Sequence, residues 1–106
     1  MAAPVPTWQL VLTDWRLIAP EGAGTVLSAL EFNFLRRLVE AGEQVRVSKR
    51  EIADSLWGNH LEVDFARIDV LLTRLRKKCQ EDIGQVLPVK TVTAYGYVLT
   101  VPCRLG

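Results

Sequence analysis

Cysteine and histidine are scarce in this chain of 106 residues. There are two cysteines, Cys79 and Cys103, and a single histidine, His60. These residues cannot by themselves supply the ligand set of a structural zinc site, so we expect no bound metal. Because 49% of the residues are apolar, the chain can form a core without disulfides. Independence from disulfides is typical of a reducing compartment, and we expect a cytoplasmic location.

Long apolar runs and an export signal are also missing. No run approaches the roughly 18 apolar residues that cross a bilayer. The first residues lack the basic stretch and hydrophobic segment of a secretion signal. We therefore expect neither a membrane span nor secretion. The sequence also lacks a second histidine, a glycine-rich phosphate loop and paired acids at a catalytic spacing. Neither an enzyme nor a cofactor is expected.

Charge is informative because its distribution is uneven. The net charge is only +1. Residues 1–66 nevertheless hold six basic and nine acidic residues, whereas residues 67–106 hold seven basic and three acidic ones. Such a split within one small domain favours a face that binds a polyanion. A basic surface that is merely solvated is the alternative.

The chain divides into one domain and two short ends. Residues 1–7, which include two prolines, are predicted to be a linker or lead-in. Residues 8–102 are predicted to form the domain, and residues 103–106 a tail. Between Trp8 and Leu27, apolar residues alternate with other residues in short segments, with a turn-forming stretch at 20–24. This pattern predicts an antiparallel β-meander of three strands.

Two capping boxes predict the starts of two helices. Ser28 is followed three residues later by Glu31, and Ser48 by Glu51. In this motif the serine hydroxyl accepts from a helical amide while the glutamate reaches back to the cap. Each helix is expected to end at the next glycine along the chain.

A third helix is predicted after Asp64, its expected N-cap, and should end at 82–84. Apolar residues recur there at spacings of 3, 4, 3 and 4, so one side must be buried. The residues of the buried side are Phe65, Ile68, Leu72, Leu75 and Cys79. Those expected on the opposite side are Arg67, Val70, Leu71, Arg74, Lys77 and Lys78.

The segments Val86–Val92 and Tyr97–Val101 are predicted to be strands joined by a tight turn at 93–96. The fold class is therefore α+β: an N-terminal antiparallel β-meander, three helices and a C-terminal β-hairpin. Two helices, a third basic helix and a hairpin form a winged helix-turn-helix. The major groove of B-DNA, about 12 Å wide, admits one helix. The hairpin then lies near the adjacent minor groove.

Five motifs in this order carry a family resemblance. They are Leu27–Phe32, Val47–Ile52, Leu56–Gly58, Arg67–Lys78, and Val89–Val92 with Tyr95–Tyr97. Over about residues 8–101 the chain resembles the OmpR/PhoB-type DNA-binding domain, the effector half of many bacterial two-component response regulators. The resemblance implies transcription regulation within a phosphorelay and binding to double-stranded DNA. It further implies a dimer on direct repeats, with the isolated domain a monomer.

The resemblance makes the segment 65–79 the recognition helix. It places Arg74 on the groove-facing side, where arginine pairs with guanine; a phosphate contact or a salt bridge is the alternative. Val70 and Leu71 would touch thymine methyl groups, unless a slight rotation of the helix puts Leu71 in the core. The residues expected on the DNA backbone, or else on a solvated face, are Arg67, Thr73, Lys77 and Lys78.

The start of the second helix and the wing supply further candidates. Ser48 and Lys49 are placed for a phosphate, although capping alone also explains Ser48. In the wing the family commonly shows Thr-Val-Arg-Gly-x-Gly-Tyr-Arg, whereas residues 91–98 lack both arginines. This departure removes cationic contacts and leaves minor-groove reading in doubt. The wing residues expected to contact DNA are Lys90, Thr91, Thr93 and Tyr95, the last of which could instead pack on the hairpin.

The loop between the second and third helices corresponds to a region that often contacts RNA polymerase in the family. Its residues here are Asn59, His60, Leu61 and Glu62. The resemblance therefore implies RNA polymerase as a further partner, with an ordinary solvated loop as the alternative.

Other residues are predicted to be structural. Asp69 would be repelled by phosphates. Arg76 lies between the two faces of its helix, and it could pair with Glu51 or Asp54. The aromatic residues expected in the core are Trp8, Phe32, Phe34, Trp15, Trp57 and Tyr97.

The sequence thus predicts a sequence-specific regulator that binds double-stranded DNA. A winged helix that serves as a protein-interaction module is the competing hypothesis. The missing wing arginines and the near-neutral net charge favour that alternative. Salt dependence of binding to random duplex DNA separates the two.

Overall fold

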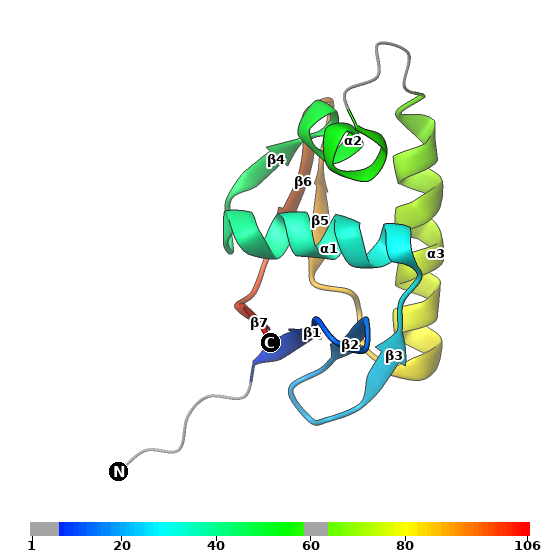
Figure 1. Ribbon diagram of the computed structural model, residues 1–106, viewed down its shortest axis with the longest axis vertical. Coiled ribbons are helices and arrows are strands. Elements are labelled where there is room, and N and C mark those ends of the chain that lie inside the picture. Colours follow the sequence, from blue (N-terminus) through cyan, green and yellow to red (C-terminus); the bar gives the residue numbers. More distant parts are fainter. Residues whose placement is uncertain (1–6, 59–63) are drawn as a thin grey trace.

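A computed structural model describes residues 7–58 and 64–106 (Figure 1). Within them lie three helices and seven strands. In chain order they are β1 (Trp8–Val11), β2 (Arg16–Ile18), β3 (Gly24–Val26), α1 (Ala29–Ala41), β4 (Arg46–Ser48), α2 (Lys49–Trp57), α3 (Ala66–Asp82), β5 (Val89–Val92), β6 (Gly96–Leu99) and β7 (Cys103–Leu105).

The predicted N-terminal meander is confirmed, and it gains a fourth strand. The sheet order is β3-β2-β1-β7, with antiparallel pairs inside the meander. β7 pairs in parallel with β1, with Trp8 opposite Cys103. Residues 103–106 are predicted to be a tail, but most of that segment, Cys103–Leu105, completes this sheet. β7 has only three residues and pairs with a strand at the other end of the chain, so no turn signal beside it reveals it.

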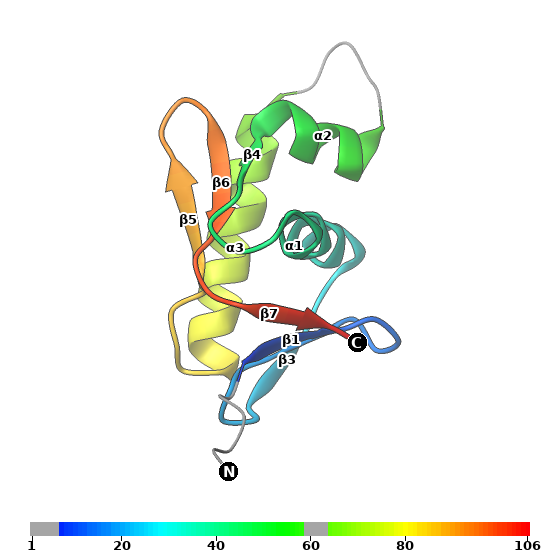
Figure 2. The same ribbon diagram turned by 90° about the vertical axis from the view of Figure 1, so that its left-hand side faces the viewer.

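Both capping boxes form as predicted. The Ser28 and Ser48 hydroxyls accept from the amides of Glu31 and Glu51, whose carboxylates accept from the serine amides. α1 ends before Gly42. It lies between the N-terminal sheet and α2, while α3 runs alongside all three (Figures 1 and 2). This arrangement leaves α3 with one long flank against the protein and the other toward solvent.

The buried side of α3 follows the predicted spacing. Ile68, Leu72, Leu75 and Cys79 are all buried. The start of the helix differs slightly, because Asp64 does not occupy the N-cap position. Its carboxylate instead accepts from the first helical amide, that of Ala66, at 2.9 Å.

The C-terminal hairpin belongs to a second sheet of order β4-β6-β5. Its strands are shorter than predicted, because β5 begins only at Val89 and β6 ends at Leu99. β4 was not predicted. It pairs with β6, and Ser48 stands opposite Gly96. The second helix therefore starts directly from a strand of the wing sheet.

One core joins the two sheets and the helices. Tyr97 of β6 is fully buried, and its ring meets that of Phe34 edge-on at 5.4 Å. Two of the aromatic residues predicted in the core lie at its margin. Trp15 is 44% exposed and stacks on Phe32, and Trp57 is only half-buried. None of the helices in the described ranges has the length and apolarity that crossing a bilayer requires.

A substitution at Gly96 tests how closely β4 packs against β6. A Cβ atom at this position would lie 2.0 Å from the Val47 carbonyl oxygen, which is backbone and cannot rotate away. Gly96→Ala should therefore lower the free energy of unfolding by about 3 kcal/mol. Chemical denaturation measures this loss.

Gly84→Ala is the matched control. Gly84 has a φ of +79° but open space around its Cα, so alanine there should cost only about 1 kcal/mol. Equal losses for the two variants would contradict the close approach of β4 and β6.

Candidate nucleic-acid interface

A stripe of exposed residues runs along α3 on the side opposite its buried residues. Arg67, Val70, Arg74 and Lys77 are all exposed and recur at spacings of 3, 4 and 3. This is the same period as the buried side, so the four residues share one face of the helix. We call these four residues the outer stripe. It carries three cations and one apolar side chain, and Val70 is 50% exposed.

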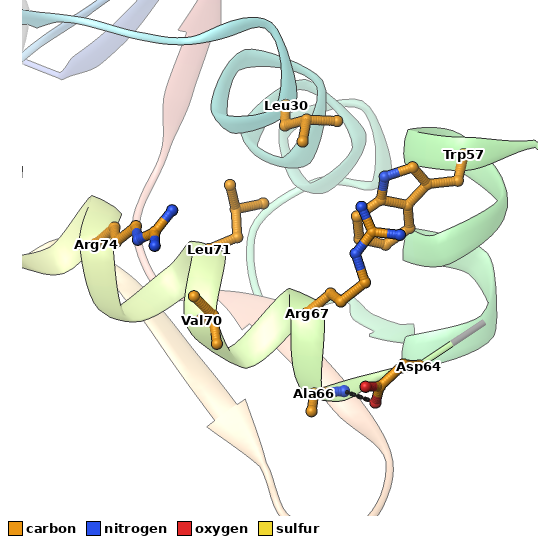
Figure 3. Close-up of a pocket in the computed structure, with 8 residues that line it drawn as sticks. All are labelled: Leu30, Trp57, Asp64, Ala66, Arg67, Val70, Leu71 and Arg74. Carbon is orange, nitrogen blue, oxygen red and sulfur yellow. Dashed lines mark hydrogen bonds between the residues drawn. The ribbon is translucent and has the colours of Figure 1, made fainter.

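A shallow hollow of about 300 Å³ borders the outer stripe (Figure 3). Its apolar lining comes from Leu30, Trp57 and Leu71, and the side chains of Arg67 and Arg74 stand at its rim. The Arg67 guanidinium lies over the indole of Trp57, with Cζ 4.6 Å from the ring centroid. Solvent therefore meets cations and an apolar surface side by side here.

Leu71 is half-buried and packs against the core. Of the two interpretations open from the sequence, the structure agrees with the rotated helix more than with an outward side chain. Thr73 is exposed, but its hydroxyl donates to the Asp69 carbonyl at 2.8 Å. Neither residue belongs to the outer stripe.

Lys78 is not on the exposed face that the sequence predicted for it. Its ammonium donates to Glu31 Oε1 at 2.6 Å and to the Val26 carbonyl at 3.2 Å. Only 6% of the Glu31 side chain is exposed, so this is a largely buried ion pair. Lys78 therefore joins α3 to the start of α1, and its ammonium group is engaged by partners within the protein.

Burial is the largest single influence on the Glu31 carboxyl and acts to raise its pKa. The hydrogen bond from Lys78, the hydrogen bonds from Ser28 and the Lys78 charge together outweigh it. The pKa of Glu31 consequently lies below its ordinary value of 4.5. The charged form of Glu31 thus stabilises the folded state at neutral pH.

Two residues of α3, Arg76 and Asp69, fasten this helix to the wing. Arg76 Nη2 donates to the Val89 carbonyl at 3.1 Å and to Thr91 Oγ1 at 3.5 Å. The prediction that Arg76 pairs with Glu51 or Asp54 is wrong, because Arg76 reaches β5 instead. Asp69 is structural, as predicted, since it accepts from the Tyr97 hydroxyl at 2.6 Å.

The acidic residues of α2 make no ion pair with α3 among the described residues. Glu51 lies 4.0 Å from Arg37 of α1. Asp54 Oδ1 is buried and has no hydrogen-bond partner among the described residues. Neither carboxylate therefore competes for the cations of the outer stripe.

The start of α2 and the tip of the wing lie together. The Lys49 amide donates to the Tyr95 carbonyl at 2.9 Å. Ser48 is occupied by its capping box, so the interpretation based on capping accounts for its hydroxyl. Tyr95 is 46% exposed beside this junction. These three candidates therefore form one cluster where α2 meets the wing.

The other wing candidates are exposed but do not share one surface. Lys90 and Thr91 are consecutive residues of β5, so their side chains point to opposite faces of the sheet. Thr93 is exposed in the turn, next to Ala94, which has a φ of +62°. Where the family commonly shows a glycine, this chain thus holds alanine in a left-handed conformation. The predicted polymerase-contact loop, residues 59–62, lies outside the described residues.

Comparison with known proteins identifies the family. The family model described as "Transcriptional regulatory protein, C terminal" matches residues 22–99. The chain belongs to this family. The two-component response regulator PhoP of Pseudomonas aeruginosa is 37% identical over 78 residues, which is 74% of this chain and 34% of that protein. The regulatory protein VirG of Agrobacterium fabrum is 36% identical over 90 residues, 85% of this chain and 35% of VirG.

This chain thus spans about a third of the length of these curated relatives. Among solved structures, the fold matches the DNA-binding domain of Klebsiella pneumoniae RstA in complex with the RstA box. Its TM-score is 0.69 at 20% identity, covering 92% of this chain and 95% of that one. The DNA-binding domain of E. coli CadC matches with a TM-score of 0.70 at 21% identity, covering 93% and 91%. The winged helix-turn-helix of the family is therefore the fold of this chain.

Two features of the site were missed in the sequence. The Lys78–Glu31 pair joins residues 47 positions apart, and Glu31 had already been assigned to a capping box. Trp57 was predicted to be a core aromatic residue that packs the short second helix. The contact between Arg67 and Trp57 had one signal in the sequence: Trp57 ends the second helix and Arg67 lies near the start of the third.

The buried ion pair yields a stability prediction. Lys78→Met leaves the Glu31 carboxylate buried without its cation, so the free energy of unfolding should fall by about 2 kcal/mol at pH 7. Lys78 is one-third exposed, which keeps this figure below that of a fully buried pair. Urea denaturation gives the value.

The loss should depend on pH in a defined direction. Because the folded-state pKa of Glu31 is lowered, its contribution is complete above the ordinary value of 4.5 and fades as the pH falls below it. The difference between Lys78→Met and the unmodified protein should therefore shrink at pH 3. Lys77→Met is the control, since its pair with Glu81 is largely exposed and should cost less than about 0.5 kcal/mol. A loss at Lys78 that is equal at both pH values would contradict the pairing.

Proposed function

We propose that this domain binds double-stranded DNA in a sequence-specific manner and is the effector domain of a two-component response regulator. The observation that carries the proposal is the outer stripe of α3, with three cations on one solvent-facing side. Family membership and relatives named as regulators support it. So does the fold shared with domains that were solved in complex with DNA.

The geometry suits a helix that enters the major groove. α3 runs alongside the rest of the fold (Figure 2), and the residues of its outer stripe are exposed to solvent. Arg74 lies in the middle of the stripe, where a bidentate contact with guanine O6 and N7 is within the reach of an arginine. Lys77 lies one turn further along, and its ammonium suits a phosphate. Val70 between the cations offers methyl groups to thymine.

The wing contributes less in this proposal than in the family pattern. Residues 91–98 contain no arginine, and Thr91 already accepts from Arg76. Lys90, Thr93 and Tyr95 remain as backbone contacts near the minor groove. Affinity of one domain for one half-site should accordingly be weak, and binding as a dimer on direct repeats compensates for this.

A protein-interaction module is the second candidate function. The hollow lined by Leu30, Trp57 and Leu71 favours it, because apolar surface beside arginines is typical of protein interfaces. The two functions differ in their response to salt. Binding to random duplex DNA that weakens steeply with salt supports the DNA-binding function, whereas no binding at low salt supports the protein module.

Specific and non-specific contacts can be separated at two residues. We expect Arg74→Ala to cost about 1–3 kcal/mol on a duplex selected from a random pool, and far less on random duplex, because it removes a base contact. Lys77→Ala should weaken both duplexes alike and reduce the salt slope by about one, because it removes a phosphate contact. Fluorescence anisotropy titrations at several salt concentrations measure both quantities. Equal losses on the two duplexes for Arg74→Ala would rule out base reading by Arg74.

A further inference from the structure

Two arginines connect α2 and α3 in opposite directions. Arg50 of α2 lies over the ring of Phe65, with Cζ 5.2 Å from the ring centroid. Arg67 of α3 lies over the ring of Trp57, at the end of α2, at 4.6 Å. Each helix thus supplies one cation, and each arginine meets an aromatic ring at the other side of the junction. We call these four residues the reciprocal clamp.

The Arg67–Trp57 half of the clamp lies at the C-terminal end of α2, whereas the polar contacts of α2 with the wing and with α1 lie near its start. α2 has only nine residues, of which Ile52 and Ala53 alone are buried. A helix of this length is not stable by itself and depends on tertiary contacts. At its C-terminal end Leu56 and Trp57 are half-buried at the margin of the core. The stacking of Arg67 on that ring therefore helps to set the angle between α2 and α3.

We infer that Arg67 is a positioning residue for α3 that acts through Trp57, with the Arg50–Phe65 contact as the second half of the clamp. This inference rests on the proposed DNA-binding function and changes one part of it, since the sequence placed Arg67 on the DNA backbone. The angle between α2 and α3 decides where Arg74 meets a base edge when α2 rests against the DNA backbone. Loosening the clamp lowers the population of the binding-competent arrangement and weakens the apparent affinity by the same factor.

The alternative role for Arg67, a direct phosphate contact, predicts different measurements. Loss of a phosphate contact reduces the slope of log K against log salt by about 0.9 and does not depend on Trp57. Loss of a positioning contact leaves the salt slope unchanged. Its effect on the affinity disappears when Trp57 is already absent. Salt slope and coupling therefore separate the two roles.

The experiment is a double-variant cycle of Arg67→Met and Trp57→Leu, measured on a selected duplex at several salt concentrations. Methionine keeps a long side chain but removes the cation. We expect Arg67→Met to weaken binding about three- to five-fold, in keeping with the strength of an exposed cation–π contact. In the Trp57→Leu background the same change should have less than about a two-fold effect. The salt slope should be unchanged throughout.

Two further variants serve as controls. Trp57→Phe keeps an aromatic ring, so the effect of Arg67→Met should persist in that background. Arg74→Met removes a cation that rims the same hollow but has no contact with the Trp57 ring among the described residues. It should weaken binding equally with Trp57 present or absent. Additive effects of Arg67→Met and Trp57→Leu, or a salt slope reduced by about 0.9 in Arg67→Met, would overturn the inference.

A measurement without DNA distinguishes failure of the inference from failure of the proposed function. Hydrogen exchange of the Val70 and Leu71 amides reports how firmly the first turns of α3 are held. Arg67→Met and Trp57→Leu should each speed this exchange, and the double variant should be no faster than the faster single one. Unchanged exchange in Arg67→Met would overturn the clamp even if DNA binding is intact. Absence of binding to every duplex, with faster exchange in the variants, would reject the proposed function alone.

Discussion

Burial of one side of α3 is the constraint on which the rest of the structure depends. Ile68, Leu72, Leu75 and Cys79 recur with the helical period and all lie in the core. Once that side is fixed inward, the helix has no freedom to rotate, and the positions opposite must face solvent. The outer stripe is a geometrical consequence of the buried one. Its charge is what the sequence adds, and a stripe of cations beside apolar groups suits a DNA groove.

Polar contacts then fix α3 along its length. Near its end Lys78 pairs with Glu31, and in its middle Arg76 binds β5. In its first turn Asp69 accepts from Tyr97 and Arg67 stacks on Trp57. Cations of α3 that lie close to neighbouring elements are engaged by them, whereas Arg74 and Lys77 project from the exposed face. This division gives the helix a defined orientation and still leaves charge available to a ligand.

The sequence revealed those features that depend on local pattern. Two capping boxes, the spacing of the buried stripe and the hairpin turn predicted the helices and the wing, because each is encoded within a few residues. β4 and β7 were missed because each has only three residues and pairs with a strand distant in the chain rather than with a neighbour across a turn.

Partners distant in the chain were also missed. Lys78 is a cation that lies one position from the outer stripe in the sequence. Only the placement of α1 shows that Lys78 pairs with Glu31. Arg76 was predicted to face α2, but the hairpin packs close enough for its guanidinium to reach the Val89 carbonyl. Long-range contacts of this kind depend on the packing of whole elements, which residue spacing does not encode.

The central claim is that the outer stripe of α3 is the surface that meets DNA. The most direct measurement is an NMR titration of the isotope-labelled domain with a duplex selected from a random pool. The account predicts that the largest chemical-shift changes fall on Val70, Arg74 and Lys77, with smaller ones at Arg67 and at the tip of the wing. Changes concentrated on the N-terminal sheet, with α3 unaffected, would contradict it.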